Sequence, residues 1–364
     1  MTEDIKAVIS GICVYFINSP IQSAEPIGDG HINDTYLVSA ADGKYVIQRI
    51  KDTADTAKYE YNYGLYADIL ASNGIKFPVW LKSKAGTYFY TDGSGYNWRM
   101  YSYIDDDIIC APPKIEHLFL LGQGLKKLHI MLQKINDKPK PVYPHLHDLM
   151  YYYDMYCKVK DDDKNICTEY LDPAIENIIS ADIDKMLKIS VDKTSVVHGD
   201  TKLANILFKD GKVTGFIDFD TLMNGSLIED VADCIRSCCI DNGLLNTDKA
   251  NELVKGYLDT CDDFNDLKLN NKQDLHNPYN VSVEHNPYDV SVEHNPYDAS
   301  DNHNPDDIIM NDIKQLPDVF NKICFELGLR YYTDAISKNK CFKEKYPGYH
   351  LERARSLFKV KWPV

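Results

Sequence analysis

The sequence predicts an α+β fold of two unequal lobes, a small lobe built on an antiparallel sheet and a larger, mainly helical lobe. Up to about residue 104, short strand-like segments alternate with glycine-containing turns. Beyond that point, apolar residues recur mostly at helical spacing. The 364 residues are enough for two cores. We therefore predict a small lobe over residues 1–104 and a large lobe over residues 105–364.

The small lobe is predicted to begin with a helix that packs on the sheet. Apolar residues between Ile5 and Phe16 follow helical spacing, and acidic residues precede them, as suits a helix N-terminus. Gly28 and Gly30 lie at the bend of the first hairpin, where glycine lets backbone N–H groups approach a phosphate. That hairpin is a strand–turn–strand over Pro26–Val38. The remaining elements expected are strands over Tyr45–Ile50, Phe77–Leu81, Thr87–Tyr90 and Asn97–Ile104, and a helix over Ala54–Ser72.

The large lobe is predicted to contain helices over Ile115–Ile135, Ile228–Cys239 and Phe325–Ile336. The last of these places Glu326, Arg330 and Asp334 on one face, where a surface charge ladder is one interpretation. His145, His147 and Asp148 lack a fourth nearby ligand, so we interpret them as a helix entry rather than a metal site.

A polar loop followed by a hairpin carries the chemistry. Asp200 and Asn205 stand five positions apart, the spacing of the kinase catalytic loop, and they follow His198 and Gly199. The strands Ile206–Phe208 and Val213–Ile217, joined through Asp210-Gly211, are expected to return Asp218 to the side of Asn205. Phosphoryl transfer needs a base and oxygen ligands for Mg²⁺. The predicted roles are Asp200 as catalytic base, Lys202 as the cation that reaches the phosphoryl group, and Asn205 and Asp218 as metal ligands.

These residues resemble those of the aminoglycoside phosphotransferases and related protein-kinase-like small-molecule kinases, and within that group the N-acetylhexosamine 1-kinases. The matching segments are Gly28–Val38, Tyr45–Ile50, Asp200–Leu203, Ile217–Thr221, Gly328–Arg330 and Tyr346-Pro347. The resemblance implies a bilobal protein-kinase-like fold, in which residues 1–104 form the nucleotide-binding lobe and residues 105–364 the catalytic and substrate lobe. It further implies ATP as co-substrate and Mg²⁺ as cofactor. It also implies phosphorylation of N-acetylglucosamine or N-acetylgalactosamine at the anomeric hydroxyl, which gives the sugar 1-phosphate. An acidic residue on the helix after Asp220 is expected to hold the catalytic loop in place.

The resemblance also assigns binding residues. The nucleotide-binding residues are Gly28, Gly30, Gln48, Arg49, Met100 and Tyr101, and the substrate-binding residues are His31, Asp220 and Arg330. Gln48 and Arg49 occupy the place of the strand lysine of protein kinases, and we favour Arg49 as the phosphate contact because of its charge. Cys341 replaces an aromatic residue of the relatives, which makes the acceptor pocket the part most open to difference.

Two alternatives stay open. One is a phosphotransferase for another small hydroxyl acceptor, such as a different sugar, an aminoglycoside, choline or homoserine. The other is a nucleotide-binding regulator without catalytic activity, against which the intact Asp200, Asn205 and Asp218 argue. His31 and Arg330 fit a neutral sugar better than a cationic acceptor.

A nine-residue repeat beginning His276-Asn277-Pro278-Tyr279 interrupts the large lobe and predicts a low-complexity insertion over residues 267–310. The net charge of −15 argues against nucleic-acid or anionic-membrane partners. No segment approaches the ~18 apolar residues of a membrane span, and the start of the chain is acidic, so we expect a cytoplasmic protein. The sequence leaves the oligomeric state open.

Overall fold

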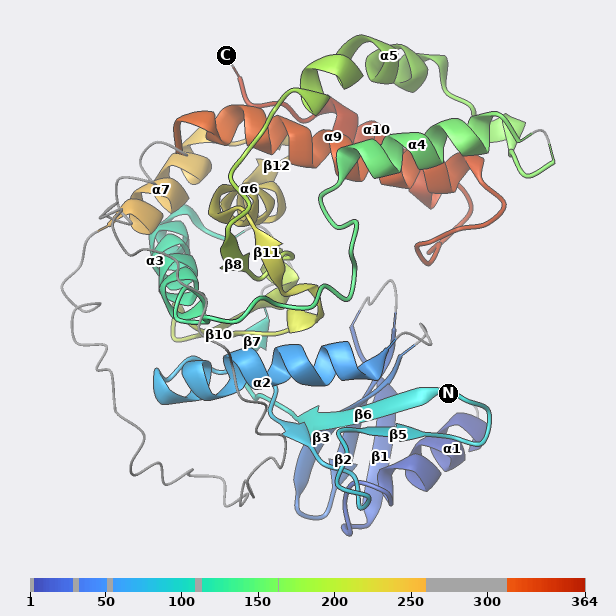
Figure 1. The fold of residues 1–364 in the computed structure, drawn as a ribbon, viewed down its shortest axis with the longest axis vertical. Helices are drawn as coiled ribbons and strands as arrows, with labels where there is room; N and C mark the ends of the chain where they lie inside the picture. The colour runs from blue at the N-terminus through green and yellow to red at the C-terminus, as the bar shows by residue number, and fades with distance from the viewer. Residues whose placement is uncertain are drawn as a thin grey trace, which may run out of the picture.

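A computed structural model of the chain describes residues 3–28, 33–50, 55–108, 113–162, 164–259 and 313–363. The chain forms two lobes, with an antiparallel sheet and one long helix in the first and most of the helices in the second (Figure 1). Among the described helices, none is long and apolar enough to cross a membrane.

The small lobe is a six-stranded antiparallel sheet in the order β1-β2-β3-β6-β4, with β5 added on β6. One face packs against α1, where Ile9 and Ile12 join Ile47 and Met100 in a buried cluster. The predicted strand at Phe77 begins only after Pro78, which has no N–H to donate to a ladder. The elements are α1 (Glu3–Cys13), β1 (Ile21–Pro26), β2 (Asp34–Ala40), β3 (Gly43–Ile50), α2 (Thr56–Ser72), β4 (Trp80–Leu81), β5 (Phe89–Thr91) and β6 (Asn97–Ser102).

The large lobe combines helices with short strand pairs. Its helices are α3 (Ile115–Leu132), α4 (Leu149–Lys160), α5 (Pro173–Leu187), α6 (Leu227–Cys238), α7 (Thr247–Leu258), α9 (Leu316–Ile336) and α10 (Tyr349–Lys359). Its strands are β7 (Asp107–Ile108), β8 (Ser195–Val197), β9 (Ile206–Lys209), β10 (Lys212–Phe216), β11 (Met223–Gly225), β12 (Ile240–Asp241) and β13 (Leu244–Leu245). Short 3₁₀ turns are η1 (Thr168–Tyr170), η2 (Leu203–Asn205), η3 (Phe219–Thr221) and η5 (Ile313–Gln315).

Helices α3 and α7 of the large lobe approach each other closely. A Cβ at Gly122 would lie 2.0 Å from the carbonyl oxygen of Leu253, and one at Gly256 would lie 1.9 Å from that of Phe119. Because such distances exclude any side chain, glycine at both positions lets the two helices pack backbone to backbone.

The structure corrects one helix prediction and confirms another. Helix α9 begins at Leu316, nine residues before the predicted start. Glu326 and Asp334 are only 2% and 3% exposed, so the interpretation as a surface charge ladder is wrong. Asp148 caps α4 by accepting a hydrogen bond of 3.1 Å from the N–H of Tyr151, which confirms the helix entry. The predicted insertion over residues 267–310 lies outside the described residues, as do Gly30 and His31.

Candidate active site

Two residues of the catalytic loop, Lys202 and Asn205, contact Asp200 of the same loop. The amide nitrogen of Asn205 donates to the carbonyl oxygen of Asp200 at 2.9 Å and to its carboxylate Oδ2 at 3.0 Å. The Lys202 ammonium contacts the same Oδ2. The structure therefore brings together the predicted base, the predicted cation and one predicted metal ligand.

Asp230 on α6 holds the backbone of this loop through hydrogen bonds. Its two carboxylate oxygens accept the N–H groups of His198, at 3.0 Å, and Gly199, at 2.9 Å. The Thr201 hydroxyl donates to the Asp230 carbonyl oxygen at 2.5 Å. A ring nitrogen of His129 on α3 lies 3.1 Å from the carboxylate. The expectation that an acid on this helix holds the catalytic loop is confirmed.

The β9–β10 hairpin returns the chain to the catalytic loop. Asp210 and Gly211 both adopt positive φ angles, 51° and 76°, as a tight hairpin turn requires. At the open end, the Ile217 N–H donates to the Asn205 carbonyl oxygen at 2.9 Å. Asp218 follows directly, in the left-handed region with φ of 67°, so the hairpin carries it to the side of Asn205 as predicted.

The two aspartates have opposite pKa shifts. Burial opposes ionisation of Asp200, but the Lys202 charge outweighs it and lowers the Asp200 pKa. The Asp218 side chain keeps contact with solvent, yet it is surrounded by protein, and this desolvation, followed by the Asp220 charge, raises its pKa. Burial works against the Lys202 charge, while Asp200 and Asp218 raise the Lys202 pKa and keep it protonated.

The donor set fits a magnesium ion. The Asn205 amide nitrogen faces Asp200, which turns the amide oxygen away from that carboxylate. Within the described ranges, no hydrogen bond or ion pair occupies the Asp218 carboxylate. Two oxygen donors from adjacent positions are the ligands that Mg²⁺ takes from a protein when phosphates and waters supply the rest.

Arg99 was missed by sequence reasoning. It lies on β6 and forms a two-bond ion pair with Asp220, at 2.7 and 2.6 Å, so that it joins the lobes. It also donates to the Gln48 side chain at 2.9 Å and lies over the Trp80 ring, 4.7 Å from its centroid. Both ion-pair partners are at most 6% exposed. Its only sequence signal is an arginine inside a strand-like run, which many surface strands share.

The strand register decides between Gln48 and Arg49. Gln48 lies opposite Arg99 on the neighbouring strand and bonds to it, on the face toward Asp220. Arg49 points to the other face, where it pairs with Asp34 at 2.5 Å and lies over the Tyr96 ring at 4.7 Å. The preference for Arg49 as the phosphate contact is therefore wrong, because alternate strand residues face opposite sides.

Met100 and Tyr101, whose backbone groups are expected to bind the adenine, direct their side chains to opposite faces of β6. The Met100 side chain is fully buried among the residues that pack on α1, so any contact of Met100 with a nucleotide is left to its backbone. Tyr101 lies on the face of Arg99, and burial raises its pKa. Of these two residues, only Tyr101 faces the space between the lobes.

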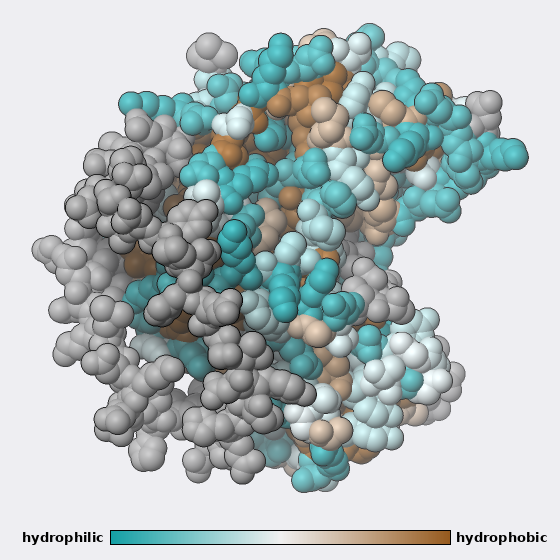
Figure 2. Space-filling view, in the orientation of Figure 1, coloured by the Kyte–Doolittle hydropathy of each residue, from teal (hydrophilic) through white to brown (hydrophobic). Residues whose placement is uncertain are grey.

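Arg330, the predicted acceptor residue that the structure describes, lies on α9 beside the segment that follows this helix. The Arg330 guanidinium lies between the Tyr152 ring, at 4.6 Å, and the Phe342 ring, at 5.0 Å. Asp334 accepts the N–H groups of Cys341 and Phe342, at 3.0 and 2.7 Å, and so fixes that segment. Figure 2 shows the molecule hollowed between the small lobe and α4, the helix that carries Tyr152.

Lys343 links the segment after α9 to the base of the glycine loop. Its ammonium donates to the Asp34 carboxylate at 2.9 Å and to the Asn33 carbonyl oxygen at 3.3 Å. Gly28, which begins the loop on the other side, has φ of 71°. The segment after α9 and the Asn33–Asp34 end of the glycine loop therefore come from opposite ends of the chain but meet across the lobes.

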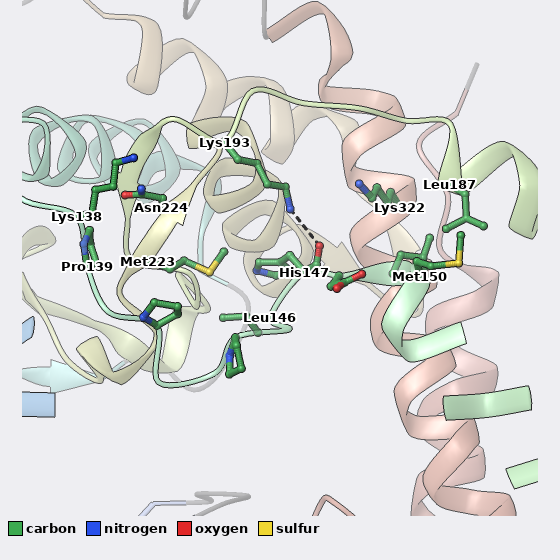
Figure 3. Close-up of a pocket in the computed structure, with 14 residues that line it drawn as sticks. Lys138, Pro139, Leu146, His147, Met150, Leu187, Lys193, Met223, Asn224 and Lys322 are labelled. Carbon is green, nitrogen blue, oxygen red and sulfur yellow. Dashed lines mark hydrogen bonds between the residues drawn. The ribbon is translucent and has the colours of Figure 1, made fainter. Parts of the chain in front are cut away.

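His147 connects α9 to the catalytic loop. It donates through Nε2 to the Gly199 carbonyl oxygen at 3.1 Å, and its Nδ1 lies 3.6 Å from Glu326 on α9. Burial lowers the His147 pKa, but Glu326 outweighs it and raises the pKa to about 9. A cavity of about 540 Å³ opens beside His147, and Lys193, Lys322 and Met223 contribute to its walls (Figure 3).

Comparisons with known proteins agree with this architecture. Residues 23–259 match the profile described as "Phosphotransferase enzyme family". A homoserine kinase of Xanthobacter autotrophicus is 24% identical over 263 residues, which cover 70% of this chain and 75% of that protein. A homoserine kinase of Brucella anthropi is 22% identical over 246 residues, 65% of this chain and 70% of that protein.

Solved structures with the same fold align over nearly the whole chain. The amicoumacin kinase hAmiN, in complex with AMP-PNP, Ca²⁺ and Ami, aligns with a TM-score of 0.59 at 12% identity, over 99% of this chain and 96% of that one. Aminoglycoside 2'-phosphotransferase-IIIa in its GDP complex aligns with a TM-score of 0.56 at 12% identity, over 97% of both chains. The prediction of a bilobal protein-kinase-like fold is confirmed.

Proposed function

Because the chain belongs to the phosphotransferase enzyme family, we propose that it transfers the terminal phosphoryl group of ATP to a hydroxyl group of an N-acetylhexosamine. The acceptor is N-acetylglucosamine or N-acetylgalactosamine, and the acceptor atom is the anomeric oxygen. The product is the sugar 1-phosphate. The observation that carries the proposal is the convergence of Asp200, Lys202, Asn205 and Asp218 on one loop and hairpin.

Each of these residues has a proposed role. Asp200, ionised because its pKa is lowered, accepts the proton of the acceptor hydroxyl. Lys202 stays protonated and neutralises charge on the transferring phosphoryl group. Asn205 and Asp218 hold Mg²⁺, which when bound would neutralise phosphate charge. Positioning and charge neutralisation carry most of this chemistry, so a strong base is not required.

The nucleotide lies, in this proposal, between the glycine loop and the face of β3 and β6 that carries Gln48 and Tyr101. Gly28 and Gly30 approach the phosphates through backbone N–H groups. The Arg99 charge is already paired with Asp220 through two hydrogen bonds, so we do not assign Arg99 to the phosphates. Lys202, which stays protonated, supplies the positive charge near them. Asp220 accepts both bonds and is 6% exposed, so we assign it to joining the lobes rather than to the acceptor.

His31 and Arg330 hold the acceptor in this proposal. A neutral sugar offers many hydroxyl groups and no net charge, so hydrogen bonds must select it. The Arg330 guanidinium, fixed between two aromatic rings, presents N–H groups in one plane. The Cys341 N–H donates to Asp334, which holds Cys341 next to Phe342 in the segment that borders Arg330.

Homoserine is the second candidate acceptor. The curated relatives above are homoserine kinases. Homoserine carries a carboxylate as well as a hydroxyl group, and a planar guanidinium binds a carboxylate with two parallel hydrogen bonds. Arg330 suits this role as well as it suits a sugar.

The test is ADP release with a panel of acceptors at equal concentration. N-acetylglucosamine, N-acetylgalactosamine, glucose, homoserine, choline and an aminoglycoside are compared with ATP alone. Phosphorus NMR of the product should show coupling to the ring proton at C1. Preference for glucose would remove the N-acetyl assignment, and preference for homoserine would replace the sugar. Turnover with none of the panel would contradict the proposal.

A further inference from the structure

A second pocket, of about 410 Å³, is lined by residues of both lobes but by none of the residues assigned above. The small-lobe loop after α2 contributes Gly74 and Lys76, and α3 contributes Lys127. The β9–β10 hairpin contributes Lys209 and Lys212. Four lysines from three separate elements therefore surround one concavity, in a chain whose net charge is −15.

Two of these lysines are only partly neutralised and two are not paired in the described residues. Asp106 pairs with Lys76 at 2.5 Å and with Lys209 at 3.8 Å, and it also accepts the Thr214 hydroxyl. Across the described ranges, Lys127 and Lys212 form no ion pair. Asp210 is the only acid among the lining residues, since Asp106 lies outside the pocket lining. The pocket therefore carries an excess of positive charge.

The cavity beside His147 gives a useful contrast. Lys193 lies 3.3 Å and Lys322 lies 3.9 Å from the carboxylate of Glu229. His147 faces Glu326. Each of these cations faces a buried acid, so that cavity gains little by taking up an anion. The second pocket, which we call the hairpin pocket because the β9–β10 hairpin forms much of its lining, differs in this respect. It has fewer acids than lysines.

We propose that the hairpin pocket binds a small anion that carries a diphosphate group, either free or as part of a nucleoside diphosphate. A lysine ammonium is a compact point charge suited to phosphate oxygens. Four such charges around about 410 Å³ match an anion with several charges better than a single carboxylate. The site is separate from the proposed catalytic cleft and does not depend on the acceptor assignment.

The location ties the anion to the catalytic elements. The N–H of Lys76 donates to the Thr214 carbonyl oxygen at 2.9 Å, so the small-lobe loop already holds the hairpin. The same hairpin connects Asn205 at one end to Asp218 at the other. An anion between Lys76, Lys127 and Lys212 would add a further link between the lobes.

The test is calorimetric titration of the full chain with inorganic pyrophosphate at low salt. The variant Lys127→Gln/Lys212→Gln removes the two unpaired charges. Lys185→Gln/Lys188→Gln, on the exposed end of α5, makes the same change in net charge away from the pocket. We expect the wild type and the α5 control to bind one pyrophosphate that the pocket variant loses or binds at least about tenfold more weakly. Raising the salt should weaken this binding, because ions screen exposed charges.

Two further measurements make the result decisive. An unchanged KM for ATP in the pocket variant shows that the cleft is intact. Titration with uridine diphosphate identifies the source, because tighter binding than pyrophosphate shows that the nucleoside contributes, and equal binding assigns the site to the diphosphate alone. If the pocket variant and the α5 control bind pyrophosphate equally, the proposal is overturned and only non-specific attraction to lysines remains.

Discussion

The catalytic loop and the acceptor wall are held in different ways. The catalytic loop is fixed by short polar contacts from Asp230, which accepts two backbone N–H groups at 3.0 and 2.9 Å. The acceptor wall is fixed by aromatic rings around Arg330 and by a single carboxylate, Asp334, that gathers the segment after α9. Hydrogen bonds to the backbone determine the positions of the catalytic-loop atoms closely. Aromatic rings stacked on a guanidinium leave its N–H groups available for hydrogen bonds to different partners.

In the proposed function, the catalytic loop carries out the phosphoryl transfer and the wall around Arg330 sets the acceptor specificity. Phosphoryl transfer needs the same groups at the same places whatever the acceptor, so the loop tolerates little change. In the proposed function, the wall around Arg330 selects the hydroxyl compound, and this wall can vary with few side chains. The predictions below test each region and the contact that joins them.

The largest effect is expected from breaking the ion pair between the lobes. Asp220→Asn leaves the buried Arg99 charge without its partner, which typically costs about 3–5 kcal/mol of unfolding free energy. Urea unfolding of the wild type and the variant measures this loss of unfolding free energy. Asp182→Asn breaks the half-exposed pair with Lys361 and should cost at most about 1 kcal/mol. Equal losses in the two variants would show that the Asp220 pair does not join the lobes.

Removal of the base should affect turnover and leave stability alone. Asp200→Asn should lower kcat by about 100-fold or more, because a positioned base is typically worth that much. Steady-state ADP release measures kcat, and thermal unfolding checks the fold. Asp210→Asn in the hairpin turn, an exposed site with φ of 51°, is the matched control and should keep normal turnover. Near wild-type turnover in a folded Asp200→Asn protein would remove the assignment.

His147 joins the catalytic loop to α9, and its contribution to the free energy of unfolding should depend on pH. His147 has a pKa raised to about 9, so its charged form contributes stability that is fully present below about pH 6.5 and lost as the pH rises through 9. Glu326, Glu229 and Asp233 face it, and Lys193 donates to its carbonyl oxygen.

Between pH 7 and pH 10, the wild type should therefore lose up to about 3 kcal/mol more unfolding free energy than His147→Gln. Urea unfolding at the two pH values measures this difference. His145→Gln, at a half-exposed histidine two positions away, should follow the wild type. Equal pH dependence in wild type and His147→Gln would show that the imidazolium does not hold the loop.

The smallest effect is expected at the acceptor wall. Arg330→Ala should raise the KM of the acceptor about tenfold, equivalent to one lost hydrogen bond of roughly 1–2 kcal/mol, and should change the KM of ATP far less. Arg355→Ala, on the outer face of α10, should change neither. A larger effect on ATP than on the acceptor would place Arg330 outside the acceptor site.

The sequence by itself determined the local parts of this protein. The spacing of Asp200 and Asn205, the Asp-Gly turn and the position of Asp218 after the second strand are contiguous, and turn geometry alone brings them together. The acid on α6 that holds the loop follows the same short stretch. Helix and strand periodicity likewise sufficed for the two-lobe architecture.

Only the tertiary structure decided the contacts between distant segments. Arg99 and Asp220 are 121 positions apart, and Lys343 reaches Asp34 over 309 positions. Whether Gln48 or Arg49 faces Asp220 depended on a register of one residue, which propensity does not set. The partners of a buried charge come from whichever segments pack against it, and packing is a property of the whole fold.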